Sequence, residues 1–311
     1  MGVFEGASRA GSGRAEIEWP TWLALAGCYT SWALALWFAP ELGWLYVIPG
    51  AITVAFHSSL QHEILHGHPT RKAWLNEVLV FPGLGLFIPY RRFRDLHLKH
   101  HNDERLTDPF DDPESFYLSA GDWSGRCMVM CTLLRFNATF AGRMLVGPAL
   151  AMWAFWRTEV GLMLRGDRAV IGAWVRHAVG VVPVVLAVRA AGIDLWVYVL
   201  CAAYPGMSLI MVRSFIEHRA AHDAPERTAI VEGCMFWRLL FLNNNYHAVH
   251  HNRPSAAWYK VPKIWQAERE DVLARNGGYL LPGYGTVIRR WLLRAREPVV
   301  HPILHRDTDP R

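Results

Sequence analysis

The sequence contains little cysteine and lacks the short motifs by which many soluble proteins bind redox cofactors or nucleotides. Five of its 311 residues are cysteine, and no two of them form a C-x-x-C pair. An odd number of scattered thiols does not fit a disulfide framework or an iron–sulfur site, and it indicates a reducing compartment. The sequence also shows no glycine fingerprint for dinucleotides, no haem-attachment segment, no internal repeat and no low-complexity tract. A redox enzyme of this composition would take its electrons from a separate partner.

Charge is missing from long apolar stretches, which points away from an ordinary soluble fold. Three uncharged runs cover residues 21–39, 42–61 and 195–212, and a weaker run at 169–188 is interrupted by Arg176 and His177. Each is close to the roughly 20 residues that a helix needs to cross a bilayer. The first run is too long for a usual signal peptide and has no small-residue cleavage site after it, so we expect it to stay as an anchor. The sequence predicts an all-α integral membrane protein with about four transmembrane helices.

The positions of the basic residues predict how the chain is oriented. Nearly all of the 32 Lys and Arg residues lie before the first run, between the second and third, or after the fourth. Because basic loops stay on the inner side, we expect both termini and the long middle region in the cytoplasm, at a bacterial inner membrane. The net charge of +5 is then explained by orientation, and no nucleic-acid partner is expected.

The chain is expected to have three parts. They are a cytoplasmic tail at residues 1–20, a membrane domain at 21–265 and a cytoplasmic C-terminal tail at 266–311. Within the membrane domain, residues 73–90 are apolar but contain several Gly and Pro, which predicts a re-entrant or interfacial hairpin. Residues 144–156 and 285–296 have the composition of helices that lie on a membrane surface.

Histidine is the residue that this sequence has in unusual number and order. Eight of the 15 histidines form three groups, HEILH at residues 62–66, HLKHH at 97–101 and HAVHH at 247–251. On a helix, positions i, i+3 and i+4 project from one face, so each group presents several imidazoles to one point. Neutral imidazole is a ligand for iron, zinc, copper and nickel. The predicted topology places all three groups on the same side of the membrane, which favours one composite metal site.

In order, spacing and topology these groups resemble the three histidine boxes of membrane fatty acid desaturases and related hydroxylases. The resemblance covers roughly residues 40–265 and includes HHNDERLTDP after the second box and NNNYHAVHHNRP around the third. It looks closest to the short bacterial branch of that superfamily. The resemblance implies a cytoplasmic cap of helices that holds a histidine-rich di-metal site. It further implies two Fe ions, O₂ as a co-substrate, and a separate ferredoxin with its reductase as the electron donor.

The resemblance also implies a lone histidine well before the third box. His218 lies directly after the fourth run and is the preferred candidate, with His222 as the alternative. The implied metal ligands are His62, His66, His97, His100, His101, His218, His247, His250 and His251. Glu217, Asn243, Asn244 and Asn245 are candidates for holding these imidazoles in position.

The reaction has more than one reading at this stage. The family activity is removal of hydrogen from an acyl chain or a similar lipid-like substrate, whereas alkane hydroxylases and carotenoid hydroxylases or ketolases carry similar boxes and insert oxygen. A different class is a membrane zinc protease, because HEILH also fits H-E-x-x-H with Glu63 as the general base. That reading leaves both H-x-x-H-H groups unexplained. A lipid-binding or metal-storing protein would not need three histidine clusters on one side.

Overall fold

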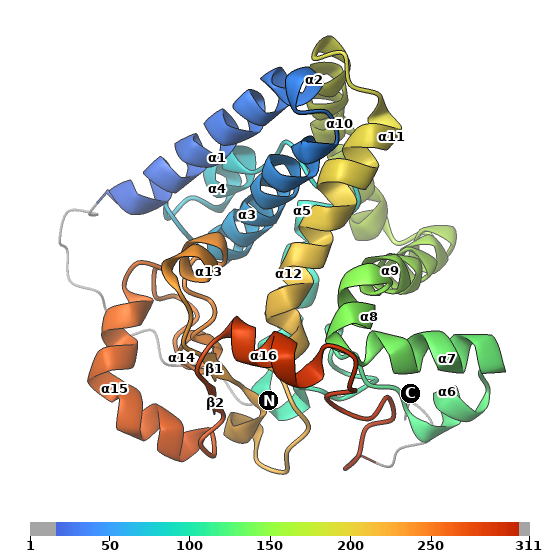
Figure 1. Cartoon of the computed structure of the whole chain (residues 1–311), viewed down its shortest axis with the longest axis vertical. Helices are drawn as coiled ribbons and strands as arrows, with labels where there is room; N and C mark the ends of the chain where they lie inside the picture. The colour runs from blue at the N-terminus through green and yellow to red at the C-terminus, as the bar shows by residue number, and fades with distance from the viewer. Residues whose placement is uncertain (1–16, 305–311) are drawn as a thin grey trace.

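The protein is mainly helical, with long helices packed side by side above a layer of shorter ones (Figure 1). This computed structural model describes residues 17–304, so the predictions for residues 1–16 and 305–311 lie outside the described part of the chain. The α-helices are α1 (Trp19–Trp37), α2 (Ala39–Leu42), α3 (Val47–Leu65), α4 (Ala73–Leu79), α5 (Tyr90–His100), α6 (Ala120–Ser124), α7 (Met128–Asn137), α8 (Phe140–Leu145), α9 (Gly147–Leu164), α10 (Arg168–Ala190), α11 (Leu195–Tyr198), α12 (Tyr204–Glu217), α13 (Met235–Leu240), α14 (His247–Asn252), α15 (Val261–Arg275) and α16 (Tyr284–Trp291). This confirms the all-α prediction.

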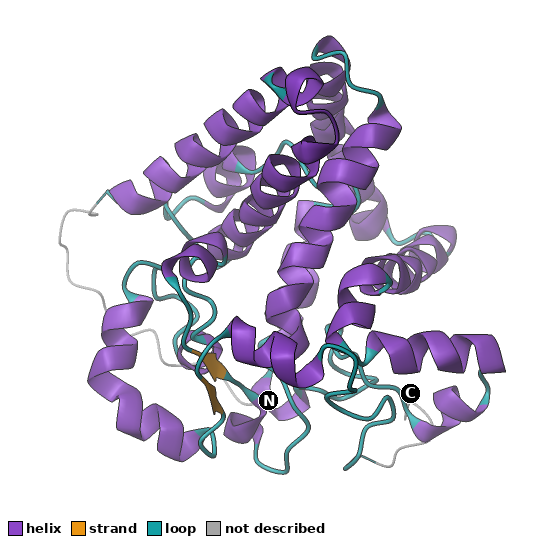
Figure 2. Cartoon of the chain, viewed as in Figure 1, coloured by secondary structure: helices purple, strands orange, loops and turns teal. Residues whose placement is uncertain are grey.

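The remaining elements are short. Three 3₁₀ turns, η1 (Gly43–Tyr46), η2 (Asp103–Arg105) and η4 (Ala224–Arg227), connect helices, and a π-helical turn, η3 (Val199–Ala203), joins α11 to α12. The orange arrows in Figure 2 are the strands β1 (Ile230–Val231) and β2 (Leu280–Leu281), which pair in parallel. This pair joins the segment between α12 and α13 to the segment between α15 and α16.

Within residues 17–304, three helical segments are long and apolar enough to cross a membrane. They are Ala39–Leu65, Arg168–Ala190 and Leu195–Glu217, and they correspond to the second, third and fourth runs of the sequence. The first run forms α1, a 19-residue helix that packs against α3. Helix α1 contains four Trp residues, with Pro, Thr, Tyr and Ser among its other residues, and it is not one of the three segments above. Trp19 and Trp37 lie at its two ends, where aromatic residues are frequent in helices that reach a membrane interface.

Two glycines allow α3 and the η3–α12 segment to approach closely. A Cβ on Gly206 would lie 2.6 Å from Cγ1 of Val54, and a Cβ on Gly50 would lie 3.0 Å from that of Ala202. Both distances are shorter than an ordinary carbon–carbon contact of about 3.5–4.0 Å. The helices consequently pack backbone against backbone. This contact fixes the relative positions of the helix that carries the first histidine box and the helix that leads to His218.

Residues 80–89 form an irregular loop between α4 and α5 that packs against two long helices. The Tyr198 hydroxyl donates to the carbonyl of Leu84 at 2.8 Å, and His177 Nε2 lies 2.8 Å from the carbonyl oxygen of Leu86. Side chains from α10 and α11 thus hydrogen-bond to the loop backbone, which has no helical partner of its own. Helix α4 has only seven residues and a loop follows it, so the segment from α4 to α5 is not a continuous span.

The surface helices differ somewhat from their predicted ranges. Residues 144–156 fall in α8 and α9, and α9 exposes Trp153 and, at its end, Leu164. Residues 285–296 overlap α16, but that helix ends at Trp291 and is followed by the exposed Leu292 and Leu293. The expected domain boundary at 265/266 falls inside α15, which continues through it to Arg275.

Candidate metal centre

The nine predicted ligands come from four places where a helix ends or begins. His62 lies in the last turn of α3 and His66 directly follows it, while His97 and His100 lie in the last turn of α5 and His101 follows that helix. His218 is the residue after α12, and His247, His250 and His251 lie on the short α14. All of these elements are fixed by buried contacts, so that the imidazoles meet in one region.

The imidazoles gather in two adjacent groups rather than one. The first group contains His62, His66, His97, His101 and His250, and the second contains His100, His218, His247 and His251. Within each group the possible ligand atoms all lie within 4.8 Å of one another. The two groups touch where the rings of His101 and His251 stack, with centroids 4.4 Å apart. Every predicted ligand is therefore in a group, and each group contains histidines from the second and third boxes.

The spacing of the ring nitrogens fits ligands that share an ion. In the second group, Nε2 of His218 lies 3.0 Å from Nε2 of His100 and 2.9 Å from Nε2 of His247. In the first group, Nε2 of His101 lies 3.0 Å from that of His97 and 3.1 Å from that of His250. Nitrogens bound to one ion at about 2.1 Å are expected about 3 Å apart.

A buried nitrogen without a partner supports the same fit. Nε2 of His66 is buried and has no hydrogen-bond partner among the described residues. A buried polar atom normally has a partner, because leaving it unpaired costs free energy. His66 projects into the five-histidine group, where an ion would satisfy this nitrogen.

Carboxylates behind the second box set which nitrogen faces the centre. His97 Nδ1 donates to Glu114 at 2.8 Å, and His100 Nδ1 donates to Asp112 at 2.8 Å. Since the Nδ1 atoms carry these protons, the Nε2 lone pairs point into the two groups. Carboxylate–histidine pairs of this kind orient metal ligands and increase their basicity. The sequence analysis missed both acids, although they lie in the acidic run DPFDDPE shortly after the second box.

Asn244 and Glu217 support the third box, as the sequence suggested. Asn244 accepts a hydrogen bond from His247 Nδ1 at 3.0 Å through Oδ1, and its Nδ2 lies 3.3 Å from Nε2 of His62. Glu217 lies 3.2 Å from His247 Nδ1 and 3.1 Å from Nε of Arg213. Asn244 therefore bridges the two histidine groups. Arg213, which sequence reasoning did not single out, partly balances the charge of Glu217.

The other two asparagines shape the backbone and do not contact the imidazoles. Asn243 has a positive φ of 57°, which asparagine tolerates better than most residues, and its side chain contacts Arg238 and the carbonyl of Trp258. The side chain of Asn245 donates to the carbonyl of Val231 on β1 at 2.6 Å. Both residues hold the turn that leads into α14.

Of the two candidates for the lone histidine, the structure brings His218 and not His222 into the centre. His218 belongs to the four-histidine group and contacts His100 and His247. His222 lies in the loop after α12, where its side chain is exposed. The helix ends at Glu217 with His218 in extended conformation, so the chain turns away before it reaches His222.

Burial keeps several of the imidazoles neutral. Loss of hydration is the main cause that holds the pKa values of His218, His247 and His250 well below their ordinary range, and repulsion from neighbouring histidines adds to it. A neutral imidazole keeps the lone pair that a metal ion requires.

His100 differs from these because carboxylates surround it. Burial opposes its protonation, but Glu114, Asp112 and Glu217 outweigh this effect and raise the pKa of His100 to about 9. Negative charge at this position favours any cation, whether a proton or a metal ion. The second group therefore has the electrostatic character of a cation site.

The structure gives no support for Glu63 as the general base of a protease. Its carboxylate accepts a hydrogen bond from the backbone N–H of Trp258 at 2.9 Å and lies 3.8 Å from Nε2 of His68. Glu63 groups with Glu18 and His68, apart from the five-histidine group that contains His62 and His66. A general base must be within reach of the bound water or substrate. In this fold the two histidines of HEILH belong to the five-histidine group, whereas Glu63 contacts Trp258 and His68 outside that group.

The fold and the centre together define a class of protein. It is a helical protein with segments apolar enough for a membrane, and it has nine histidines in two adjacent groups at the ends of its helices. The model of the fatty acid desaturase family matches residues 42–282, which is well over half of the chain and includes all nine histidines. The chain belongs to the fatty acid desaturase family. None of the curated proteins matches it. Family membership identifies an oxidoreductase with a lipid substrate.

Proposed function

We propose that the protein is an O₂-dependent di-iron desaturase that introduces a double bond into an acyl chain or a similar lipid-like substrate. The observation that carries this proposal is the division of the nine histidines into adjacent groups of five and four. A zinc hydrolase needs one ion and about three protein ligands, whereas these groups provide enough neutral donors for two ions. Two irons with only neutral imidazole ligands leave room for O₂.

The nine histidines would be divided between the two irons. His62, His66, His97, His101 and His250 would hold one iron, and His100, His218, His247 and His251 would hold the other. When bound, the irons supply the oxidising power needed to remove hydrogen from an unactivated C–H bond.

The groups behind the histidines keep them in place. Asp112 and Glu114 fix the orientation of His100 and His97, and Asn244 connects His247 to His62. Burial of His100, Asp112 and His247 limits the access of water to the region, which strengthens electrostatic effects there.

The balanced reaction requires an outside source of electrons. A CH₂–CH₂ unit, O₂, two electrons and two protons give CH=CH and two molecules of water. We infer that a separate ferredoxin with its reductase supplies the electrons. Hydroxylation consumes the same reagents but gives an alcohol and one water, so the product distinguishes the two reactions.

The proposed setting is the cytoplasmic side of a bacterial inner membrane. Support comes from the distribution of Lys and Arg and from the three apolar helical segments, to which α1 would add a fourth span. In this arrangement residues 21–265 form the membrane domain, residues 1–20 a cytoplasmic tail, and residues 266–311 a cytoplasmic tail with an interfacial helix.

Elemental analysis and Mössbauer spectroscopy of detergent-purified protein test the proposal. We expect about two magnetically coupled irons per chain, followed by new double bonds in lipids of cells that express the protein. One zinc per chain, with no iron taken up during anaerobic loading, would contradict the di-iron centre. New hydroxyl groups without double bonds would keep the centre but replace desaturation with hydroxylation.

A further inference from the structure

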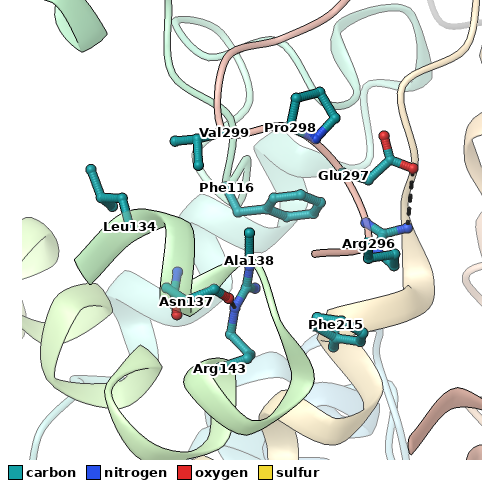
Figure 3. Close-up of a pocket in the computed structure, with 10 residues that line it drawn as sticks. All are labelled: Phe116, Leu134, Asn137, Ala138, Arg143, Phe215, Arg296, Glu297, Pro298 and Val299. Carbon is teal, nitrogen blue, oxygen red and sulfur yellow. Dashed lines mark hydrogen bonds and ion pairs between the residues drawn. The ribbon is translucent and has the colours of Figure 1, made fainter. Parts of the chain in front are cut away.

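A small cavity lies beside the metal centre and contains two arginines. Its volume is about 20 Å³, and its walls include Phe116, Asn137, Arg143, Phe215 and Arg296. Figure 3 shows the Arg143 side chain extending from α8 towards the Phe116 ring, with Arg296 and Glu297 on the opposite wall. The walls thus come from α7, α8, α12, the loop before α6 and the segment after α16.

Arg143 is a buried cation without an acidic partner. Its side chain is 8% exposed, and no carboxylate among the described side chains pairs with it. Its one hydrogen bond runs from Nε to the carbonyl of Asn137 at 3.3 Å, and its guanidinium lies over the Phe116 ring at 4.9 Å. Burial, reinforced by Arg296, lowers the pKa of Arg143 to about 10. A buried charge is normally paired, so an anionic partner is expected at this site.

A second polar atom in the same wall is also unsatisfied. Oδ1 of Asn137 is buried and has no hydrogen-bond partner in the described part of the chain. This oxygen is a hydrogen-bond acceptor, so a donor such as a water molecule would satisfy it, whereas the oxygen of an anion would not. Arg296, in contrast, is partly neutralised by Glu297 at 3.8 Å. Two arginines and one glutamate leave the cavity with a net positive charge.

One residue of the cavity wall contacts the backbone of a histidine in the metal centre. Arg296 donates from Nη2 to the backbone carbonyl of His218 at 2.6 Å, and Phe215 lies one helical turn before His218 on α12. The far wall is held in place by backbone hydrogen bonds from Arg296 to Ala138 and from Leu118 to Val299. A group bound in the cavity would therefore lie about one helical turn from a ligand of the four-histidine group.

We propose that this cavity binds the carboxylate of the substrate, which makes a free carboxylic acid the substrate class. The inference rests on the proposed function, because it assigns the head group of the molecule that the metal centre would oxidise. A cavity of about 20 Å³ has room for about one water-sized group, so it would take one oxygen of a carboxylate while the rest of the ligand lies outside it. Arginine recognises carboxylates with a planar pair of donors.

Binding of a short carboxylate tests the proposal without requiring turnover. The full-length, iron-loaded protein in detergent is titrated calorimetrically with hexanoate and with hexanol, which has the same chain but no charge. We expect saturable binding of hexanoate and at least about tenfold weaker binding of hexanol. Arg143→Gln should weaken hexanoate binding about tenfold and leave hexanol unaffected. Arg135→Gln, an exposed arginine on neighbouring α7, is the matched control and should bind like the wild type.

A second variant keeps the test decisive if Arg143→Gln does not fold. Asn137→Asp places a carboxylate beside Arg143. The buried cation then has a partner within the chain, which should compete with an added carboxylate for the Arg143 guanidinium. We expect this variant to keep its iron but to lose hexanoate binding about tenfold. Equal binding of hexanoate to the wild type and to Asn137→Asp would overturn the proposal. So would the absence of saturable hexanoate binding to the wild type.

Turnover then separates this inference from the proposed function. If hexanoate binding depends on Arg143 while no fatty acid gains a double bond or hydroxyl, the carboxylate site stands and the proposed reaction falls. If long-chain acids and their methyl esters are oxidised equally well, and Arg143→Gln has no effect on KM, the reaction stands and the carboxylate site is wrong.

Discussion

His100 donates a hydrogen bond from Nδ1 to the carboxylate of Asp112 at 2.8 Å, and both side chains are buried. This contact presents the His100 lone pair to the four-histidine group. We expect Asp112→Ala to weaken metal binding in that group by about 10- to 100-fold, the range typical for the loss of such a carboxylate. Iron content after dialysis against a graded chelator measures the effect. Asp111→Ala, a change at the neighbouring acid, serves as the control and should retain iron.

Variants of His218 and His222 test which of these two nearby histidines is a metal ligand. His218→Ala should reduce iron to about one per chain and abolish turnover, because the four-histidine group then keeps three ligands. His222→Ala should retain both irons, since that side chain is exposed. Iron analysis of the two purified variants checks this expectation. If His222→Ala loses iron and His218→Ala does not, the assignment of the ninth ligand is reversed.

A change at Glu63 separates the proposed oxidoreductase from a zinc hydrolase, in which this residue would be the general base. An amide oxygen in Glu63→Gln can still accept the hydrogen bond that the carboxylate receives from the backbone N–H of Trp258. We therefore expect iron content and turnover within about twofold of the wild type. A general base of H-E-x-x-H type would lose about 10²-fold or more of its rate on the same change. Parallel assays for oxidised lipid and for peptide hydrolysis reveal which activity, if any, is lost.

The second histidine box depends on a buried ion pair some distance from the metal centre. Arg92 on α5 binds Glu159 on α9 with Nε at 2.9 Å, Trp174 on α10 donates to the same carboxylate, and Glu159 is 1% exposed. Glu159→Ala leaves the charge of Arg92 unpaired, and we expect a loss of about 3–5 kcal/mol in the free energy of unfolding. Thermal unfolding in detergent, with iron content as a second readout, measures it.

An exposed ion pair gives the matched control for that experiment. Arg189 and Asp194 lie 2.7 Å apart, and both side chains are more than half exposed. Asp194→Ala should change the free energy of unfolding by less than about 1 kcal/mol. Similar losses for Glu159→Ala and Asp194→Ala would show that the buried pair does not hold α5 in place.

The helical class and the grouping of imidazoles within each histidine box could be predicted from the sequence, because both depend on local patterns. His97, His100 and His101 project from one face of a helix, whatever the position of that helix in the fold. The uncharged runs are long and apolar, and such runs are typical of transmembrane helices. His218 was a candidate because the family resemblance implies a lone histidine before the third box, and His218 lies just beyond the fourth apolar run.

The missed features depend on tertiary contacts that no local pattern encodes. Asp112 and Glu114 reach the second box because the chain folds back after η2, and nothing in their spacing shows this turn. The three consecutive asparagines looked equivalent in sequence, yet Asn244 alone contacts imidazoles, while Asn243 and Asn245 hold backbone. The division of nine histidines into five and four likewise arises from the packing of α5 against α14, since each group takes members from both.

The way in which the two histidine groups are assembled restricts when the protein can acquire its metals. Each group needs an imidazole from α14, near the end of the family-matched region, together with partners from segments that are synthesised much earlier. On a ribosome, the first two boxes emerge long before α14, and they supply four histidines of the first group but only His100 of the second. The four-histidine group can therefore hold an ion only after the third box has been synthesised and the helices have packed, so its assembly is a late event in folding.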